Sequence, residues 1–325
     1  MKKYLLYIMA GVLTCGFAAC SEDDLTADPS LTETMFDRQD ANAAIQEAND
    51  ALYEKYGSRA YYRFNDSEFQ LDWTSNYSNL TYVPVPDGYE EQVFKMINFI
   101  KDDVFSAYPD AMVRRYLPAR IFLVDSARQS NSYKAYLELK VHAVAISDVG
   151  PRLEKWTTSK WTTLQTNLVN SMLNSIYDNN KDKLAEFMAA KDVDGIITYR
   201  YDTYTKAGYV FPGEFGKNNE TKLQYNIYLA GFSDYTHGAL ASLGLSIKPT
   251  DTVDLGNFLS FIFTTPKSRL DYLLKELTEF TRLKRRAYLL AQFAKDVLGM
   301  DPVAMQNASC PDDPVPAGYF DSLNE

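Results

Sequence analysis

The chain has 325 residues, of which 46% are hydrophobic and 23% charged, and its formal net charge at pH 7 is −10. This apolar fraction is enough for one or two packed domains and excludes a disordered chain. The negative charge argues against a nucleic-acid partner, because phosphate binding requires a field of Lys and Arg side chains. Three cysteines exclude a disulfide-rich scaffold and a zinc ribbon, and two histidines exclude a metal site built from three histidines.

Residues 1–19 have the pattern of a signal peptide. Lys2 and Lys3 precede an apolar stretch from Tyr4 to Leu13, which is too short to span a bilayer as a helix. The following Ala-Ala-Cys sequence resembles a bacterial lipobox, so we predict that residues 1–19 are removed and that Cys20 is acylated. The alternative is a plain secretory signal that ends in cysteine by chance. A lipid on Cys20 would hold the protein on a membrane without a spanning helix.

Residues 20–35 are predicted to form an acidic tether behind the lipid. The segment begins with Ser21-Glu22-Asp23-Asp24 and contains few apolar residues, so it cannot bury a core. An acidic cluster at this place resembles the surface-export signal of Bacteroidetes lipoproteins; a charged spacer is the alternative. We therefore expect an outer-membrane lipoprotein that is exposed at the cell surface.

The rest of the chain is expected to form a single domain over residues 36–306, followed by a flexible tail over 307–325. Its first half predicts helices and short strands over 36–56, 61–64, 89–107, 121–124 and 134–146, with a proline-containing loop over 65–87. Its second half predicts helices over 162–178, 181–190, 222–243, 252–263, 267–280 and 281–298. The pattern favours an α+β fold, with a small mixed sheet in the N-terminal half and a mainly helical C-terminal half.

Common catalytic and nucleotide-binding motifs are missing from the sequence, which has no phosphate loop, dinucleotide fingerprint, GxSxG elbow or CxxC pair. His142 is interpreted as a sheet-surface residue. His237 follows Asp234 by three positions, which would place both on one helical face. Most such pairs are exposed or capping interactions, and the alternative is a weak metal site completed by a further carboxylate.

The order of the elements resembles a known family. A helix leads into Tyr61-Tyr62-Arg63-Phe64-Asn65-Asp66, and a loop separates it from Tyr116-Leu117-Pro118-Ala119-Arg120-Ile121-Phe122-Leu123-Val124. After an alternating strand and a helical half, the last helix closes with Leu298-Gly299-Met300-Asp301-Pro302. Together with the lipobox, this order is similar to the zinc-binding metallopeptidase lipoproteins of the Bacteroidetes, over about residues 36–306. The resemblance implies a zincin-like α+β fold.

That family carries an HExxH helix, a GF-x-x-YA segment and a later ED-x-A-E helix. Two histidines at i and i+4 bind Zn²⁺, the glutamate between them takes a proton from metal-bound water, and a distant carboxylate completes the site. In this chain the matching helix has Asn170 and Asn174 in place of the histidines and Ser171 in place of the glutamate, and Asn257 stands at the distant carboxylate. Gly231-Phe232-Ser233-Asp234-Tyr235-Thr236 fits the second segment.

We therefore expect a zincin-like scaffold that is not an enzyme and binds no zinc or other cofactor, because an amide oxygen is a poor zinc ligand and serine is no general base near neutral pH. Asn170, Ser171, Asn174 and Asn257 would line a leftover cleft that hydrogen-bonds a peptide or glycan. The alternative is that the three asparagines tile a solvated helix face.

Aromatic residues around the polar loop offer a second candidate binding surface. Amphipathic rings on a loop can stack on sugars or anchor a peptide, although such rings also pack beneath their own loop. The candidates are Tyr61, Tyr62, Trp73, Tyr77 and Tyr82.

These features predict a lipid-anchored, cell-surface pseudoenzyme that binds a peptide, a protein or a glycan. One alternative is an active metal-dependent peptidase with a non-standard zinc site at Asp234 and His237. Another is a structural subunit of an outer-membrane uptake complex, which the resemblance implies and the sequence itself does not show.

Overall fold

A computed structural model describes residues 40–69, 79–106, 108–139, 143–191, 213–217, 224–225, 227–233 and 250–324. The chain divides into the units Met1–Ala41 and Asn42–Glu325, and the elements described below belong to the second unit. They form a mixed α/β structure with one small mixed sheet and many helices. None of the helices in the described ranges combines the length and the apolar composition that a membrane span requires.

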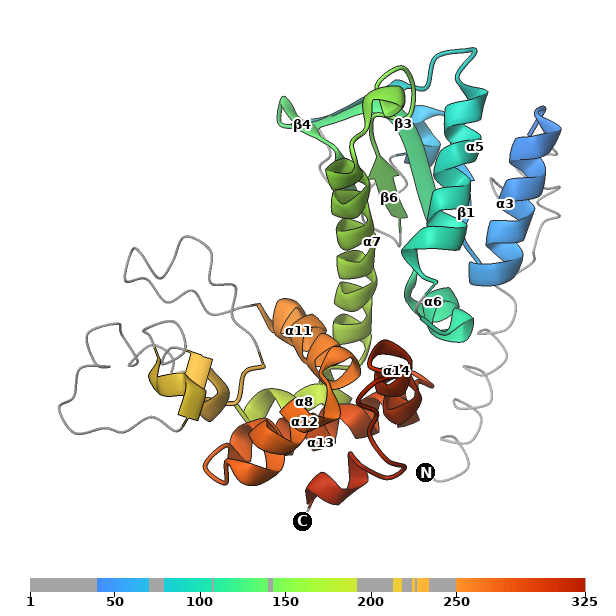
Figure 1. Ribbon diagram of the computed structural model, residues 1–325. Helices are drawn as coiled ribbons and strands as arrows, with labels where there is room; N and C mark the ends of the chain where they lie inside the picture. The colour runs from blue at the N-terminus through green and yellow to red at the C-terminus, as the bar shows by residue number, and fades with distance from the viewer. Residues whose placement is uncertain are drawn as a thin grey trace, which may run out of the picture. The chain divides into compact units, whose positions relative to one another are not determined.

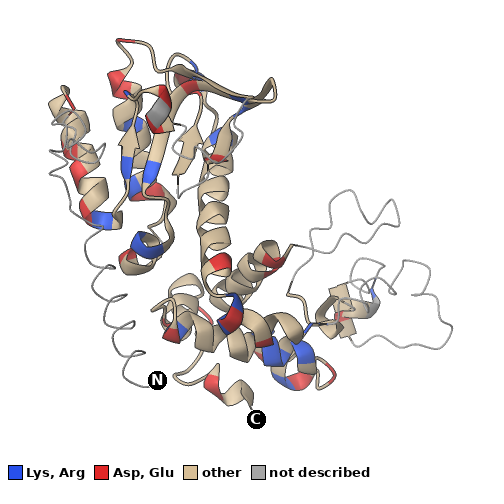
Figure 2. Cartoon of the chain, turned by 180° about the vertical axis from the view of Figure 1, so that it is seen from behind, with Lys and Arg blue, Asp and Glu red and all other residues tan. Residues whose placement is uncertain are grey.

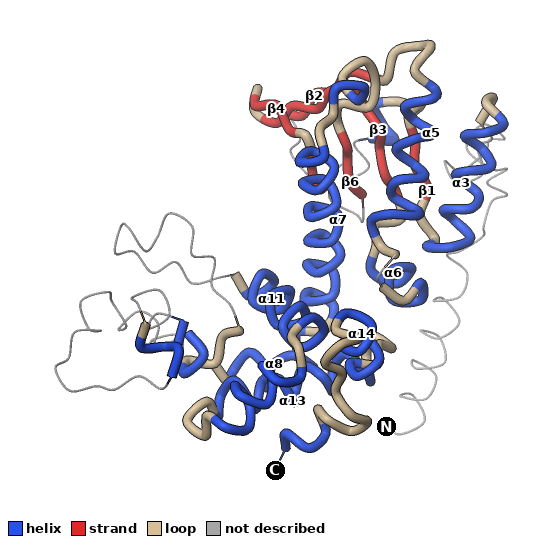
Figure 3. Tube along the Cα trace, viewed as in Figure 1, coloured by secondary structure: helices blue, strands red, loops and turns tan. Residues whose placement is uncertain are grey.

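The sheet is built around its longest strand, β3 (Arg120–Gln129), as Figures 1 and 3 show. The main path has the order β1-β3-β6-β5, with β1 (Arg59–Tyr61) and β6 (Ala143–Ile146) parallel to β3 and β5 (Tyr136–Leu139) antiparallel to β6. The distal half of β3 pairs antiparallel with β2 (Leu80–Pro84) and β4 (Ser132–Lys134). All four residues of β6 are buried, as expected for a parallel strand covered on both faces.

Four α-helices, one π-helix and one 3₁₀ turn accompany the sheet in the described part of the first half of the chain. α3 (Ala43–Tyr56) begins where the Asn42 side chain accepts hydrogen bonds from two backbone amides, and it ends at Gly57, whose φ of 71° is left-handed. α5 (Glu90–Asn98) continues directly into the π-helix η1 (Phe99–Val104). α6 (Asp110–Tyr116) precedes β3, and the short α4 (Asp66–Phe69) and the 3₁₀ turn η2 (Leu153–Lys155) complete this part.

The second half begins with α7 (Thr158–Asn179), which contacts β5, α6, η1, α8 and α11 and so links the sheet with the later helices. The later elements are α8 (Lys181–Ala189), η4 (Gly213–Gly216), α11 (Asp251–Thr264), α12 (Lys267–Asp271), the π-helix η5 (Tyr272–Glu276), α13 (Thr281–Asp296), α14 (Pro302–Ser309) and η6 (Asp321–Asn324). The predicted α+β organisation is therefore confirmed at the level of a small mixed sheet with many helices.

Several predicted elements differ in detail from those observed. The alternating stretch 134–146 is not one strand: β5 and β6 pair antiparallel with each other, and residues 140–142 lie outside the described residues. The predicted loop 65–87 contains α4 and β2. The predicted helix 222–243 lies largely outside the described residues, and those described within it include helical residues at 224–225 and 227–229.

The segment from 307 to 324, for which we predicted a flexible tail, instead packs on the helices. Its apolar side chains Val315, Tyr319, Phe320 and Leu323 are buried. The buried side chain of Gln306 donates to the carbonyl of Thr265 and accepts from the Val315 amide at 3.0 Å, which fastens the turn after α14. The proline content suggested looseness, but buried rings and satisfied amides hold this segment in place.

Candidate functional site

The middle of α7 has an uncharged polar face. Between Lys160 and Asp178 the helix carries no charged side chain, and it is the long tan helix of Figure 2. Its buried side, which packs into the core, consists mainly of Leu164, Leu168, Met172, Leu173 and Ile176. Apart from Trp161 and Val169, the remaining positions carry amides and hydroxyls, so this helix can offer hydrogen bonds but no net charge.

The predicted zinc positions on α7 have three different environments. Asn170 is exposed, and Asn174 is half-buried and donates from Nδ2 to Oε1 of Glu138 on β5 at 3.3 Å. Ser171 is buried and lies beside the hydroxyl of Tyr136, also on β5. Burial raises the pKa of Tyr136 well above its usual value, against the opposing contact with Ser171, so this hydroxyl stays protonated. Asn174 and Ser171 thus join α7 to the β5 edge of the sheet.

α11 crosses α7 just beyond these positions. A side chain at Gly256 would place its Cβ 2.9 Å from Cδ1 of Leu173, so the glycine permits the close approach of the two helices. The Tyr177 hydroxyl donates to Oδ2 of Asp251 at 2.8 Å. Asn257, which is half-buried, directly follows Gly256. The structure therefore brings α7 and α11 together, although among the described residues no hydrogen bond joins the three asparagine side chains to one another.

The donor set on these two helices does not fit a zinc ion. It consists of three neutral amides and one serine hydroxyl, whereas structural and catalytic zinc sites use thiolates, imidazoles and carboxylates. Within the described ranges, no group of three or more His, Cys, Asp or Glu residues is placed to hold a metal. His142, Asp234 and His237 lie outside the described residues, so the alternative metal site stays a prediction.

Behind the α7–α11 crossing lies a buried cluster of charged side chains. Asp254 on α11 is 2% exposed and contacts two cations: its Oδ2 is 2.9 Å from Nζ of Lys191 and 2.6 Å from Nη2 of Arg286. Lys191 also contacts Asp251 at 2.8 Å. Two cations and two carboxylates balance one another, which is the condition under which charges are tolerated inside a protein.

Arg286 on α13 is the centre of this cluster, and its side chain has no exposed surface. Its Nε donates to the carbonyl of Phe187 at 3.0 Å and its Nη1 donates to the carbonyl of Gly231 at 2.7 Å. The guanidinium also lies over the rings of Phe187, Phe232 and Phe258. Burial lowers the pKa of Arg286, and Asp254 opposes this shift. One side chain therefore ties α8, the 227–233 segment and α11 to α13.

Sequence reasoning did not identify this cluster. Asp254 lies three residues before Asn257, which was compared with the carboxylate of the ED-x-A-E helix, but its partners Lys191 and Arg286 are 63 and 32 residues away in the chain. No local spacing signals a contact of that separation. The burial of Lys191, Asp254 and Arg286 is typical of a cluster that holds structural elements together.

A second buried carboxylate, Asp148, follows β6. It is a non-glycine residue with a φ of 68°, and it accepts hydrogen bonds from Tyr133, Arg152, Trp156 and Lys160 at 2.6–3.3 Å. Burial disfavours its charged form, but the hydrogen bonds from Tyr133, Lys160 and Arg152 outweigh burial and hold the pKa of Asp148 below its usual value. The four partners fix the strained turn after β6.

The predicted binding aromatics that the structure describes do not form an exposed platform. Tyr61 and Tyr62 are buried, with 8% and 6% of their surface exposed. Tyr82 is half-buried, packs against Phe64 and Phe69, and donates to Asp66, and burial together with Asp66 raises its pKa to about 12. Trp73 and Tyr77 lie outside the described residues. For the three described tyrosines, packing beneath their own loop is the better interpretation.

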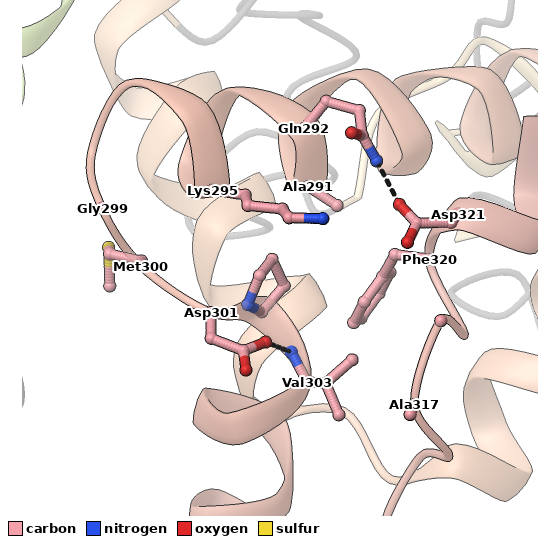
Figure 4. A pocket seen from close by; sticks show the side chains of 12 residues that line it. Ala291, Gln292, Lys295, Gly299, Met300, Asp301, Val303, Ala317, Phe320 and Asp321 are labelled. Atoms are coloured by element: carbon pink, nitrogen blue, oxygen red, sulfur yellow. Dashed lines mark hydrogen bonds between the residues drawn. The ribbon is translucent and has the colours of Figure 1, made fainter.

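A pocket of about 420 Å³ lies between α13, α14 and the C-terminal segment (Figure 4). Phe320, Pro302 and Val303 supply apolar surface, and Lys295 extends along its side. Its polar groups are largely engaged in structural contacts, since Gln292 donates to Asp321 at 2.6 Å and Asp301 caps α14 through the Val303 amide. This pocket is a by-product of the turn that returns the C-terminal segment to α13.

Comparison with known proteins gave one similar structure. No protein-family model matches the chain, and no curated protein matches it. The crystal structure of a “putative zinc-binding metallo-peptidase” from Bacteroides caccae is similar to this chain at 12% sequence identity and a TM-score of 0.37, over 88% of this chain and 96% of that one. Likeness at this level carries no inference about activity.

Proposed function

We propose that the protein is a cell-surface lipoprotein that binds an extended peptide segment along the β5 edge and the amide face of α7, without hydrolysing it. The observation that carries the proposal is the hydrogen bond between Asn174 and Glu138, because it sets an uncharged, amide-bearing helix face directly beside an edge strand. Under this proposal, a zincin-like scaffold retains a surface that binds a peptide chain but lacks the zinc ligands and the general base that hydrolysis requires.

Edge strands favour this ligand class. β5 pairs with β6 on one side, and within the described part of the chain no strand pairs with its other edge. An unpaired edge offers backbone N–H and C=O groups to an incoming strand, which is the basis of β-augmentation. Asparagine side chains both donate and accept, so Asn170 and Asn174 match the alternating groups of a peptide backbone.

The anchor completes the proposal. Acylation of Cys20 and the acidic segment 20–35 would hold the binding domain at the outer membrane with its ligand face free to meet peptides or partner proteins. The support comes from the sequence pattern of residues 1–24. Treatment of cells with a signal peptidase II inhibitor, followed by mass analysis of Cys20, tests this part separately from ligand binding.

The binding part is tested with a phage-displayed random peptide library panned against the purified full-length protein in detergent. The synthetic form of a selected peptide is then titrated against the wild type, the Asn170→Ala/Asn174→Ala double variant and the control Asn179→Ala, which removes an exposed amide from the last turn of the same helix. At about 0.5–1.5 kcal/mol for each hydrogen bond, the double variant is expected to lose about tenfold in affinity while the control is unchanged.

Three outcomes would overturn the proposal. They are the failure of the library to yield any binder, an unchanged affinity in a folded double variant, and cleavage of the selected peptide after addition of Zn²⁺. Cleavage of the peptide would show that the protein is an active zinc-dependent peptidase.

A further inference from the structure

A second groove lies on the far side of α7 from the amide face. It has a volume of about 660 Å³ and is bounded by α5, η1 and the first turn of α7. Its residues are Glu91, Phe94, Lys95, Asn98, Phe99, Asp102, Asp103 and Trp161. Trp161 and Asn170 are nine residues apart, which corresponds to about 180° around an α-helix and about 14 Å along it. The groove is therefore separate from the amide face.

The floor of the groove is aromatic. Trp161 is half-buried, and its ring lies edge-to-face with Phe99 at a centroid distance of 4.5 Å and with Trp156 at 4.8 Å. Phe94, one helical turn before Asn98, is 39% exposed. The contacts with Phe99 and Trp156 hold the Trp161 ring in place, so a ligand that stacks on this ring loses little free energy in ordering the side chain.

The rim of the groove is polar and carries both signs of charge. Glu91, Asp102 and Asp103 are exposed carboxylates, and Asn98 supplies a half-buried amide. The ammonium of Lys95 lies 5.3 Å from the centre of the Trp161 ring. Carboxylates accept hydrogen bonds from hydroxyl groups, while the ammonium and the amide donate to them, so the rim suits a ligand that both donates and accepts.

The wall that carries Asp102 and Asp103 is the π-helix η1, a rare backbone form that occurs frequently at functional sites. Hydrogen bonds from α3 and α7 hold it from outside the groove. The carbonyl of Lys101 accepts from the Tyr56 hydroxyl at 3.2 Å, and the carbonyl of Asp103 accepts from Nε2 of Gln165 on α7 at 3.4 Å. The wide turn is thus fixed in place, and its carboxylates point to solvent beside a rigid indole.

We propose that this groove binds a neutral saccharide. A pyranose ring has an apolar C–H face that can stack on Trp161 and Phe94, and its hydroxyls can use the carboxylates, Lys95 and Asn98 at once. An acidic glycan would meet three carboxylates, of which Asp102 is paired with Lys101 at 3.5 Å, beside the single lysine of the groove, Lys95. A cationic peptide would bring its charge close to the ammonium of Lys95, which lies 5.3 Å from the centre of the indole ring. The aromatic floor, together with hydrogen-bond donors and acceptors on the rim, therefore suits a neutral polyol.

The experiment uses full-length protein in detergent, an array of neutral and acidic glycans, and titrations with maltopentaose, cellopentaose and mannopentaose followed by tryptophan fluorescence. At least one neutral oligosaccharide is expected to bind, and Trp161→Ala is expected to weaken that binding by about tenfold or more. Asp102→Asn/Asp103→Asn is expected to weaken it several-fold, while Asp110→Asn, an exposed acid on α6 outside the groove, leaves it unchanged.

Because both aspartates are exposed, their double variant decides the question even if Trp161→Ala fails to fold. The proposal is overturned if no neutral glycan binds, if affinity is retained in folded Trp161→Ala or in the double aspartate variant, or if an acidic glycan or an octalysine peptide binds more tightly than every neutral one. The Asn170→Ala/Asn174→Ala variant is expected to bind the saccharide normally, which separates this site from the peptide site.

Discussion

Replacement of Arg286 by methionine is expected to lower the free energy of unfolding by about 3–5 kcal/mol, the cost of breaking a buried ion pair from one side. The substitution leaves Asp254 with Lys191 as its nearby cation and removes the donor from the carbonyls of Phe187 and Gly231. The loss of these two hydrogen bonds adds to the cost, and the apolar packing of methionine against three phenylalanine rings offsets part of it. A loss of this size is a large part of the 5–15 kcal/mol typical of a domain.

The matched control is the neighbouring arginine. Arg285 has 42% of its side chain exposed and pairs with Glu186, so Arg285→Met is expected to change the free energy of unfolding by about 1 kcal/mol or less. Both variants and the wild type are unfolded with urea and followed by circular dichroism, and the midpoints are compared at a common slope. If Arg286→Met lies within about 1 kcal/mol of Arg285→Met, the reasoning that this cluster ties four elements together is refuted.

Three further predictions concern glycine geometry, pH and metal. Gly231→Ala is expected to destabilise the protein by about 2 kcal/mol or more in thermal unfolding, because at a φ of 88° the added Cβ would lie 2.9 Å from Arg282 Cβ and 3.3 Å from the Ala190 carbonyl. The control is Gly299→Ala, since Gly299 is also left-handed but has no neighbouring atom within 4 Å, and this substitution should cost clearly less. Equal costs for the two variants would contradict the prediction. Because the pKa of Asp148 is lowered in the folded protein, its carboxylate contributes stability above the unfolded-state pKa of about 3.9, and this contribution is lost as the pH falls toward the folded-state pKa. Asp148→Asn should therefore be less stable than the wild type near pH 6 and should lose less stability below about pH 4. Stability curves of the two proteins that run parallel in acid would disprove this. Protein exposed to excess Zn²⁺ and desalted is expected to retain less than about a tenth of an equivalent by mass spectrometry of metals, and close to one equivalent, lost on mutation of His237, would show a working site.

The parts of the fold that were predictable from sequence have local signals. The apolar run Ile121–Val124 marks the core of β3, and the stop at Gly57 marks the end of α3, where the left-handed residue closes the helix. In the first case the apolar residues are those that a buried strand needs, and in the second the glycine is the residue that a left-handed backbone favours. The start of α3 was placed too early, because residues 40–42 are not helical and the Asn42 cap begins the helix at Ala43.

The parts that were missed depend on contacts between distant segments. The Tyr-rich stretch at 61–62 suggested a binding surface, yet both rings are buried, since an aromatic residue in a sequence carries no sign of which partner covers it. The groove at Trp161 was missed for the same reason. Its residues come from α5, η1 and α7, and η1 is a π-helix that a period of 3.6 residues does not predict.

The two helices that carry the amide positions are held together by contacts that do not involve the amides. Gly256 allows the close approach to Leu173, Tyr177 bonds Asp251, and Asp254 anchors α11 to Arg286. Each of these contacts lies on a core-facing or crossing position of its helix, whereas Asn170 is exposed and Asn174 bonds to the edge strand. Because the crossing needs no metal to hold it, the residues at these two positions are free to serve ligand binding. Their substitution should therefore alter affinity for a peptide while leaving the free energy of unfolding within about 0.5 kcal/mol of the wild type, as is usual for surface positions.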